Sequence, residues 1–232
     1  MKRKIFFFVK VFKEKAHAEA LLNGSLYINR LSYFQKIEDE VEANRRDEYD
    51  GISVWLQPGQ VILKINDYGI NSEDLAAPIS ARLHYHDNLN VFCLYAAHSG
   101  EFESLSEETL PEFNKQLELP DKYFKLGKHA VVITNKSEFI QRIKSSVQKN
   151  GYGIEAKLVD YYDPTEFSGH FGEQAVFKKR IKFQDQREYR FAIDTGIYGD
   201  DALRLEIGDI RDIAHSCDVT DVNKGLEIKL AK

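Results

Sequence analysis

Apolar and polar positions alternate most clearly over residues 183–193. Tyr189, Phe191 and Ile193 fall on one side of this alternation, and Glu188 and Arg190 fall on the other. A period of two residues is typical of a half-buried strand. We predict such a strand, with Gln186, Glu188 and Arg190 in a row on the face opposite the aromatic rings. That row suits either a solvated line of salt bridges or a catalytic carboxylate between an amide and a guanidinium.

The rest of the chain divides into short elements without an intervening linker. Helical spacing of apolar residues predicts helices at 14–23, 106–117 and 135–149, with Ser137 as a candidate cap for the last. Residues 91–97 form an apolar run that is typical of a central buried strand. Further strands are expected at 4–12, 26–28, 52–55, 61–65, 81–86, 130–134, 153–161, 203–207 and 226–230, and the turn Gln57-Pro58-Gly59-Gln60 predicts that 52–55 and 61–65 pair as a hairpin. We therefore predict one α+β domain over residues 1–232, with mixed, mostly antiparallel sheets flanked by short helices.

Composition agrees with a globular protein and narrows the choice of partners. The 232 residues are 43% hydrophobic and 30% charged, which is enough to bury a core. The formal net charge of −5 argues against bulk electrostatic binding of nucleic acid, although a local basic strip remains possible. Lys10 and Lys13 interrupt the apolar opening of the chain, and no run approaches the length of a membrane span. We expect a cytoplasmic protein that does not bind membranes.

Several kinds of site are not favoured by the sequence. There is no glycine-rich phosphate loop, no nucleophile elbow and no zinc spacing, and Cys93 lies in the apolar run as a small hydrophobic residue. His84 and His86 would share a strand face with Arg82, but no third ligand follows. The segment 36–51 is dense in charge, typical of either a solvated turn or a loop that handles a polar ligand. Its acidic clusters do not show convergence of oxygens, so we expect no metal site.

A resemblance in element order adds a specific hypothesis. The first strand, a short helix closed by Asn23-Gly24, a strand leading to Ser32-Tyr33-Phe34, and a late strand with Gln186-x-Glu188 are together similar to the ADP-ribosyltransferase fold. The chain also resembles uncharacterised bacterial proteins carried in phage-defence (abortive infection) loci. The motifs that carry this second resemblance are Ala18 to Tyr27, Arg46-Asp47 to Gly51, and Glu188-Tyr189-Arg190.

The resemblance implies an NAD-dependent transferase, with NAD as a substrate. Glu188 would hydrogen-bond the ribose and stabilise an oxocarbenium-like charge, and Gln186 would orient the incoming nucleophile. Basic residues would pair with the pyrophosphate, and Lys10, Lys13 or Arg30 would take the place of the basic residue that the family carries on its first strand. The expected NAD-binding residues are Lys10, Arg30, Ser32, Tyr33, Phe34 and Arg46.

The expected partners follow from the same resemblance. A toxin-like effector of phage defence would transfer ADP-ribose to a macromolecule, either RNA or DNA or a protein, and an antitoxin or another neutralising partner would control it. The alternative is a non-catalytic binding or sensor module of a phage-defence system, in which the 36–51 loop recognises a partner.

Overall fold

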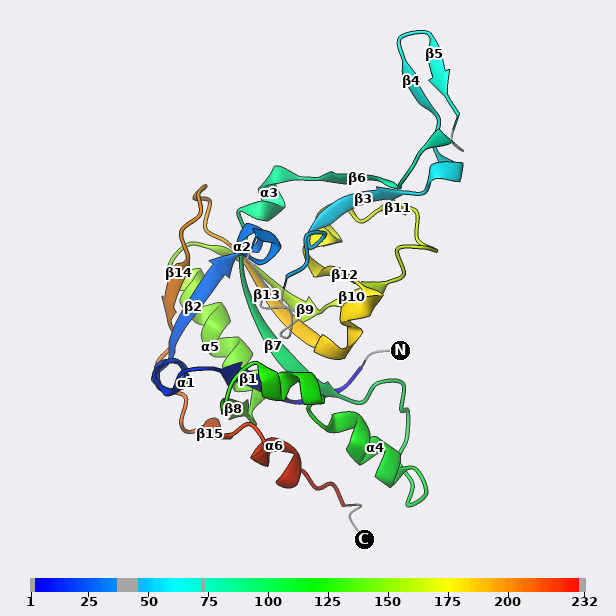
Figure 1. The fold of residues 1–232 in the computed structure, drawn as a ribbon. Helices are drawn as coiled ribbons and strands as arrows, with labels where there is room; N and C mark the ends of the chain where they lie inside the picture. The colour runs from blue at the N-terminus through cyan, green and yellow to red at the C-terminus, as the bar shows by residue number, and fades with distance from the viewer. Residues whose placement is uncertain (1–2, 37–45, 72–73, 230–232) are drawn as a thin grey trace.

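The computed structural model describes residues 3–36, 46–71 and 74–229, which form a single α+β domain around an eight-stranded antiparallel sheet (Figure 1). The strand order is β14-β2-β7-β1-β8-β15, and β13 and β9 continue the sheet from the other edge of β7. The strands of this sheet are β1 (Ile5–Phe12), β2 (Ser25–Arg30), β7 (Asn90–His98), β8 (His129–Ile133), β9 (Gly153–Leu158), β13 (Glu188–Asp194), β14 (Leu203–Glu206) and β15 (Ala214–Asp218). The predicted class and the mostly antiparallel sheet are confirmed.

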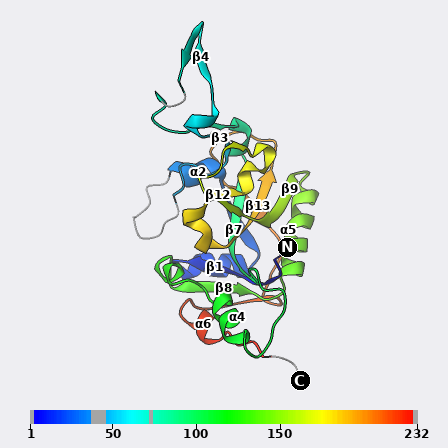
Figure 2. The same ribbon diagram turned by 90° about the vertical axis from the view of Figure 1, so that its right-hand side faces the viewer.

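Helices cover both faces of the sheet, because alternate residues of its central strands point to different cores. Phe8 of β1 packs with Phe191 of β13 against α1 (Lys15–Leu22) and α5 (Lys136–Lys149). Val9 and Tyr95 point the other way, into a second core with α4 (Leu110–Leu117) and α6 (Asp221–Lys224). Figure 2 shows α5 beside β9, and α4 and α6 together at the opposite end of the molecule.

The sheet opens between β1 and β2, which share one edge of β7. β2 pairs with β7 only at Asn29↔Val91 and Arg30↔Asn90. β1 pairs with the far end of β7, from Val9↔Tyr95 onward, and then continues along β8 as far as Phe12. Lys10 reaches across the opening and donates from Nζ to the Cys93 carbonyl at 2.7 Å. The opposite edge of β7 is paired along Asn90–Tyr95 by β13.

Smaller elements build a lobe above this opening. They are α2 (Leu31–Lys36), β3 (Ile52–Leu56), β6 (Ile79–Arg82), α3 (His84–Asp87), β10 (Asp160–Tyr162), β11 (Gly169–His170), β12 (Lys178–Arg180) and the 3₁₀ helices Gly172–Phe177 and Ile181–Gln186. The 3₁₀ helix Asp121–Lys125 lies instead in the second core, where Tyr123 packs with α4. A short 3₁₀ turn, Pro58–Gln60, leads to a hairpin of β4 (Leu63–Ile65) and β5 (Tyr68–Ile70), which projects away from the body (Figures 1 and 2). None of the helices within the described ranges has the length and apolar character needed to cross a bilayer.

Several local predictions were wrong. Residues 52–55 and 61–65 do not pair, because β3 pairs with β6 and residues 63–65 form their own hairpin. The expected strand 81–86 ends at Arg82 and becomes α3, so His84 and His86 do not lie on one strand face. Asn135, rather than Ser137, caps α5 by accepting from the Glu138 amide. Residues 226–229 form no strand.

Candidate functional site

Glu188 opens β13 and is the centre of a buried charge network. Only 5% of its surface is exposed. Arg190 donates from Nε to one carboxylate oxygen at 2.6 Å, and Lys179 donates from Nζ to the other at 3.0 Å. The strand pattern explains this geometry, since residues two apart on β13 lie on the same face. The alternative of a solvated salt-bridge row is wrong for these residues, because Arg190 is only 1% exposed.

Asp50, which is 140 positions from Arg190 in the sequence, completes the network. Its carboxylate accepts two hydrogen bonds from Arg190, each of 2.8 Å, in the bidentate arrangement that suits a guanidinium. Lys179 Nζ also lies 3.6 Å from Asp50. The Val176 carbonyl accepts a further bond from Arg190 at 2.6 Å. Two cations and two carboxylates therefore neutralise one another in the interior.

Lys179 ties the two predicted catalytic residues together. Its ammonium donates to Gln186 Oε1 at 2.7 Å as well as to Glu188. The prediction that Gln186 belongs to the strand is wrong, because Gln186 ends the 3₁₀ helix Ile181–Gln186. Arg187 then takes a left-handed conformation with φ of 42°, which turns the chain into β13. Gln186 reaches Glu188 through this turn and the shared lysine, and not through the alternation of a strand.

The network keeps Glu188 ionised. Burial works against the charged form, but Arg190 and Lys179 outweigh it and hold the pKa of the Glu188 carboxyl well below its ordinary value. Burial likewise opposes the charge of Lys179, yet Glu188 and Asp50 raise the pKa of its ammonium above the ordinary value. The neighbouring Cys93 thiol behaves oppositely, since burial and the Glu188 charge raise its pKa to about 12. Glu188 is thus an anion and a hydrogen-bond acceptor, and Cys93 is a neutral thiol.

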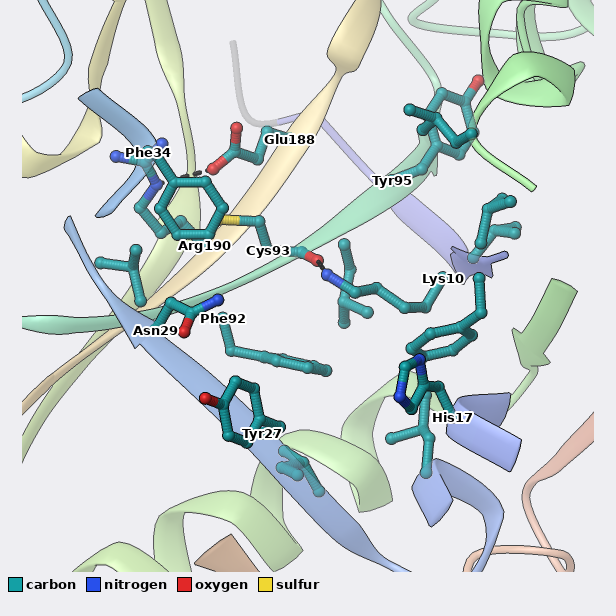
Figure 3. Close-up of a pocket in the computed structure, with 18 of the residues that line it drawn as sticks. Lys10, His17, Tyr27, Asn29, Phe34, Phe92, Cys93, Tyr95, Glu188 and Arg190 are labelled. Atoms are coloured by element: carbon teal, nitrogen blue, oxygen red, sulfur yellow. Dashed lines mark hydrogen bonds and ion pairs between the residues drawn. The ribbon is translucent and has the colours of Figure 1, made fainter. Parts of the chain in front are cut away.

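A cavity of about 820 Å³ lies at the opening between β1 and β2, and Glu188 and Gln186 line it. Figure 3 shows Glu188, Arg190 and Phe34 at one end of this cavity, Tyr27 and His17 at the other, and Cys93 and Phe92 between them. The charged residues of its lining are Lys10, Lys13, Lys122, Lys179, Arg190, Arg204, Glu14, Asp50 and Glu188. Cations outnumber carboxylates there by two to one, in a chain whose formal net charge is −5.

The structure brings some of the predicted site residues together and leaves others outside. Four of the predicted residues line this cavity together, namely Gln186, Glu188, Lys10 and Phe34. The other predicted residues do not line it: Arg30, Ser32, Tyr33 and Arg46.

One of these outlying residues, Arg30, has structural partners instead. Arg30 is buried and donates from Nε to the Asp201 carbonyl at 3.0 Å, and also to the Asn88 carbonyl. Ser32 is buried in α2. Tyr33 and Arg46 are exposed.

The 36–51 loop contributes differently from what either sequence interpretation assumed. Residues 37–45 lie outside the described part of the chain. The remainder buries two aspartates, of which Asp50 binds Arg190 and Asp47 accepts from Arg180 at 2.7 Å. Burial and the charge of Asp50 raise the pKa of Asp47. Within the described ranges, no group of three or more His, Cys, Asp or Glu side chains could hold a metal ion.

Sequence reasoning missed Lys179 and Asp50. A signal for each existed, since Lys179 lies in the basic run 178–180 and Asp50 lies in the loop motif that ends at Gly51. What the sequence could not show was that residues 50 and 190, which are 140 positions apart, form one ion pair. Comparison with known family models, curated proteins and solved structures finds no match.

Proposed function

We propose that the cavity between β1 and β2 binds NAD and that the protein transfers ADP-ribose from NAD to a macromolecular target, a nucleic acid or a protein. The observation that carries this proposal is the position of a carboxylate with a lowered pKa, Glu188, at one end of a large, cation-rich cavity. The cavity volume of about 820 Å³ is within the range of cofactor-sized sites, roughly 300–1,000 Å³.

The lining suits the parts of a dinucleotide. Lys10 and Lys13 supply positive charge for a pyrophosphate. Phe34, which lies beside Arg190 at the Glu188 end of the cavity, offers a flat apolar ring for nicotinamide (Figure 3). Arg30, Ser32, Tyr33 and Arg46 are not part of this proposal, because they do not line the cavity.

Glu188 has the properties that the reaction requires. The bond between C1′ of the ribose and the nicotinamide nitrogen breaks, and nicotinamide leaves with the bonding electron pair. The sugar then carries oxocarbenium-like positive charge, which a fixed carboxylate stabilises. The acceptor forms the new bond to C1′ and releases its proton. Lys179 and Arg190 use one hydrogen bond on each Glu188 oxygen, and a carboxylate has further lone pairs that can accept from a ribose hydroxyl.

The test is release of nicotinamide from labelled NAD, with and without nucleic acid and protein acceptors. Glu188→Gln keeps the shape of the side chain but removes its charge, so release should fall by at least about a hundredfold, which is typical for loss of one preorganised electrostatic group. Glu155→Gln on β9 is the matched control, since Glu155 is exposed and forms a surface ion pair with Lys157. Gln186→Ala provides a second variant in case Glu188→Gln does not fold. Wild-type protein that releases no nicotinamide with any acceptor refutes the proposal.

A binding module without chemistry is the second candidate, and the projecting hairpin favours it. Ile62, Ile65 and Tyr68 are 85%, 59% and 80% exposed. A two-stranded hairpin is marginal by itself in water, and such apolar side chains are typical of a surface that contacts a partner, for instance an antitoxin. Replacing residues 62–70 by a short glycine linker should then abolish partner binding, and neither the wild-type protein nor this variant should release nicotinamide from NAD. Charge reversal at Asp47 does not test this candidate, because Asp47 is buried against Arg180.

A further inference from the structure

Tyr27 is an exposed aromatic ring inside the lining of the cavity. It lies in β2 and is 60% exposed, and it is directly opposite Arg204 of β14. The Arg204 guanidinium lies 5.8 Å from the centroid of the Tyr27 ring. Both side chains line the same cavity as Glu188. Isolated exposed aromatics are common on protein surfaces, but this one is paired with a cation at a ligand-sized cavity.

The register of the sheet puts this pair on the same face as the Glu188 network. Leu26 and Ile28 of β2 are buried in the core beneath α1 and α5, so Tyr27 points to the opposite face. Cys93 of β7 and Arg190 of β13, which are partners in the ladder, also point away from that core. The ring and the charge network therefore look onto one surface, on either side of the opening in the sheet.

The separation of the two ends follows from the strand order. β2 and β13 lie on opposite edges of β7, and paired strands are about 4.8 Å apart, so Tyr27 and Glu188 are separated by at least about 10 Å across the sheet. Figure 3 shows the two residues at different ends of the cavity, with Phe92 and Cys93 between them. This is too far for one ring to contact both residues, but it suits a ligand with a base at one end and a sugar at the other.

We propose that Tyr27 and Arg204 form a base-stacking platform for the purine of a nucleotide whose sugar and phosphates extend toward Glu188. An aromatic ring stacks on any purine face, and a guanidinium adds a planar cation that tolerates the same stacking. The phosphate charge faces the cations of the lining. This inference rests on the proposed function in placing a nucleotide in the cavity, but it can be tested with a ligand that the enzyme does not turn over.

The test compares AMP with ribose 5-phosphate by isothermal titration calorimetry at fixed salt. The two probes carry the same phosphate and differ by the adenine. For wild-type protein we expect AMP to bind about tenfold more tightly or better, because one stacked base contributes at least that much. Tyr27→Ala should abolish the difference and leave ribose 5-phosphate unchanged, and Tyr27→Phe should retain it. Tyr198→Ala, at an exposed tyrosine that does not line the cavity, is the control and should bind as wild type does.

Each result separates this inference from the proposed function. Equal binding of the two probes, no binding of either, or an AMP preference that survives Tyr27→Ala overturns the platform, whatever the protein does with NAD. A Tyr27-dependent preference for AMP in a protein that releases no nicotinamide supports the platform and refutes the transferase. Nicotinamide release with a KM for NAD that is unchanged in Tyr27→Ala supports the transferase and overturns the platform.

Discussion

Replacing Arg190 by methionine tests the buried network, because this one side chain binds both carboxylates. Arg190 makes two hydrogen bonds to Asp50, one to Glu188 and one to the Val176 carbonyl. Methionine fills much of the same volume without the charge. In Arg190→Met, Asp50 and Glu188 remain buried with Lys179 as their shared cation.

The magnitude follows from what the variant leaves behind. Removing one partner of a buried ion pair costs about 3–5 kcal/mol, and here two buried carboxylates would be left with Lys179 as one shared cation. We expect about 4 kcal/mol of lost unfolding free energy at pH 7, which is a large part of the stability of an average domain. The same type of change at Arg211→Met should cost far less, because Arg211 binds Glu19 and Asp209 on the surface, where solvent screens the charges.

The pH dependence gives an independent check on the sign. In the wild type the folded pKa of Glu188 is below its unfolded value, so its contribution to stability is present above the unfolded pKa and is lost as pH falls through the folded one. Arg190 is the largest favourable influence on that pKa, and removing it raises the folded pKa toward the ordinary value. The stability difference between wild type and Arg190→Met should therefore shrink as the pH falls below about 4.5.

Urea unfolding followed by circular dichroism at pH 7 and at pH 4 measures both effects. Adding Asp50→Leu to Arg190→Met should recover part of the lost unfolding free energy, because it removes the buried carboxylate that Arg190 paired with. If Arg190→Met costs no more than Arg211→Met, or if its cost grows as the pH falls, the reasoning about the network is wrong.

Three further predictions concern the backbone and the thiols. Gly24→Ala should lose about 2 kcal/mol or more of unfolding free energy, because φ is 85° and a Cβ would meet a backbone oxygen at 1.9 Å. Gly59→Ala is the control in the same urea assay. A Cβ there would meet nothing within 4 Å, so the unfolding free energy should change by less than about 0.5 kcal/mol. Asn135→Ala removes the cap of α5 and should cost about 1 kcal/mol, and a thermal melt that is unchanged would contradict the assignment of the cap. In the native protein at pH 8 the Cys93 thiol, with its pKa raised to about 12, should resist iodoacetamide until the protein unfolds, and mass spectrometry should find Cys217 alkylated first.

Local patterns in the sequence were sufficient for the elements whose environment is set by their own residues. The alternation at 188–193 and the apolar run at 91–97 correctly predicted β13 and β7, because periodicity reports which faces of a strand are buried. The helix at 14–23 and its glycine stop are also confirmed, as Gly24 takes a left-handed conformation.

What the sequence could not provide was the meeting of distant residues. Whether the polar face of β13 is solvated depends on Asp50 and Lys179, which belong to two other segments of the chain. Their ion pairs with Glu188 and Arg190 make this face a buried network. The opening between β1 and β2 depends on two strands sharing one edge of β7, and pairing of this kind leaves no local trace. Tyr27 could therefore not be predicted as a site residue, because its exposed ring becomes a candidate only through its position in the cavity at that opening.

The most direct test of the central claim is a crystal structure of the protein soaked with NAD. We expect NAD to bind in the cavity between β1 and β2, with a nicotinamide-ribose hydroxyl within about 3 Å of a Glu188 carboxylate oxygen. NAD bound elsewhere on the protein, or a cavity without NAD at millimolar concentration, would contradict it.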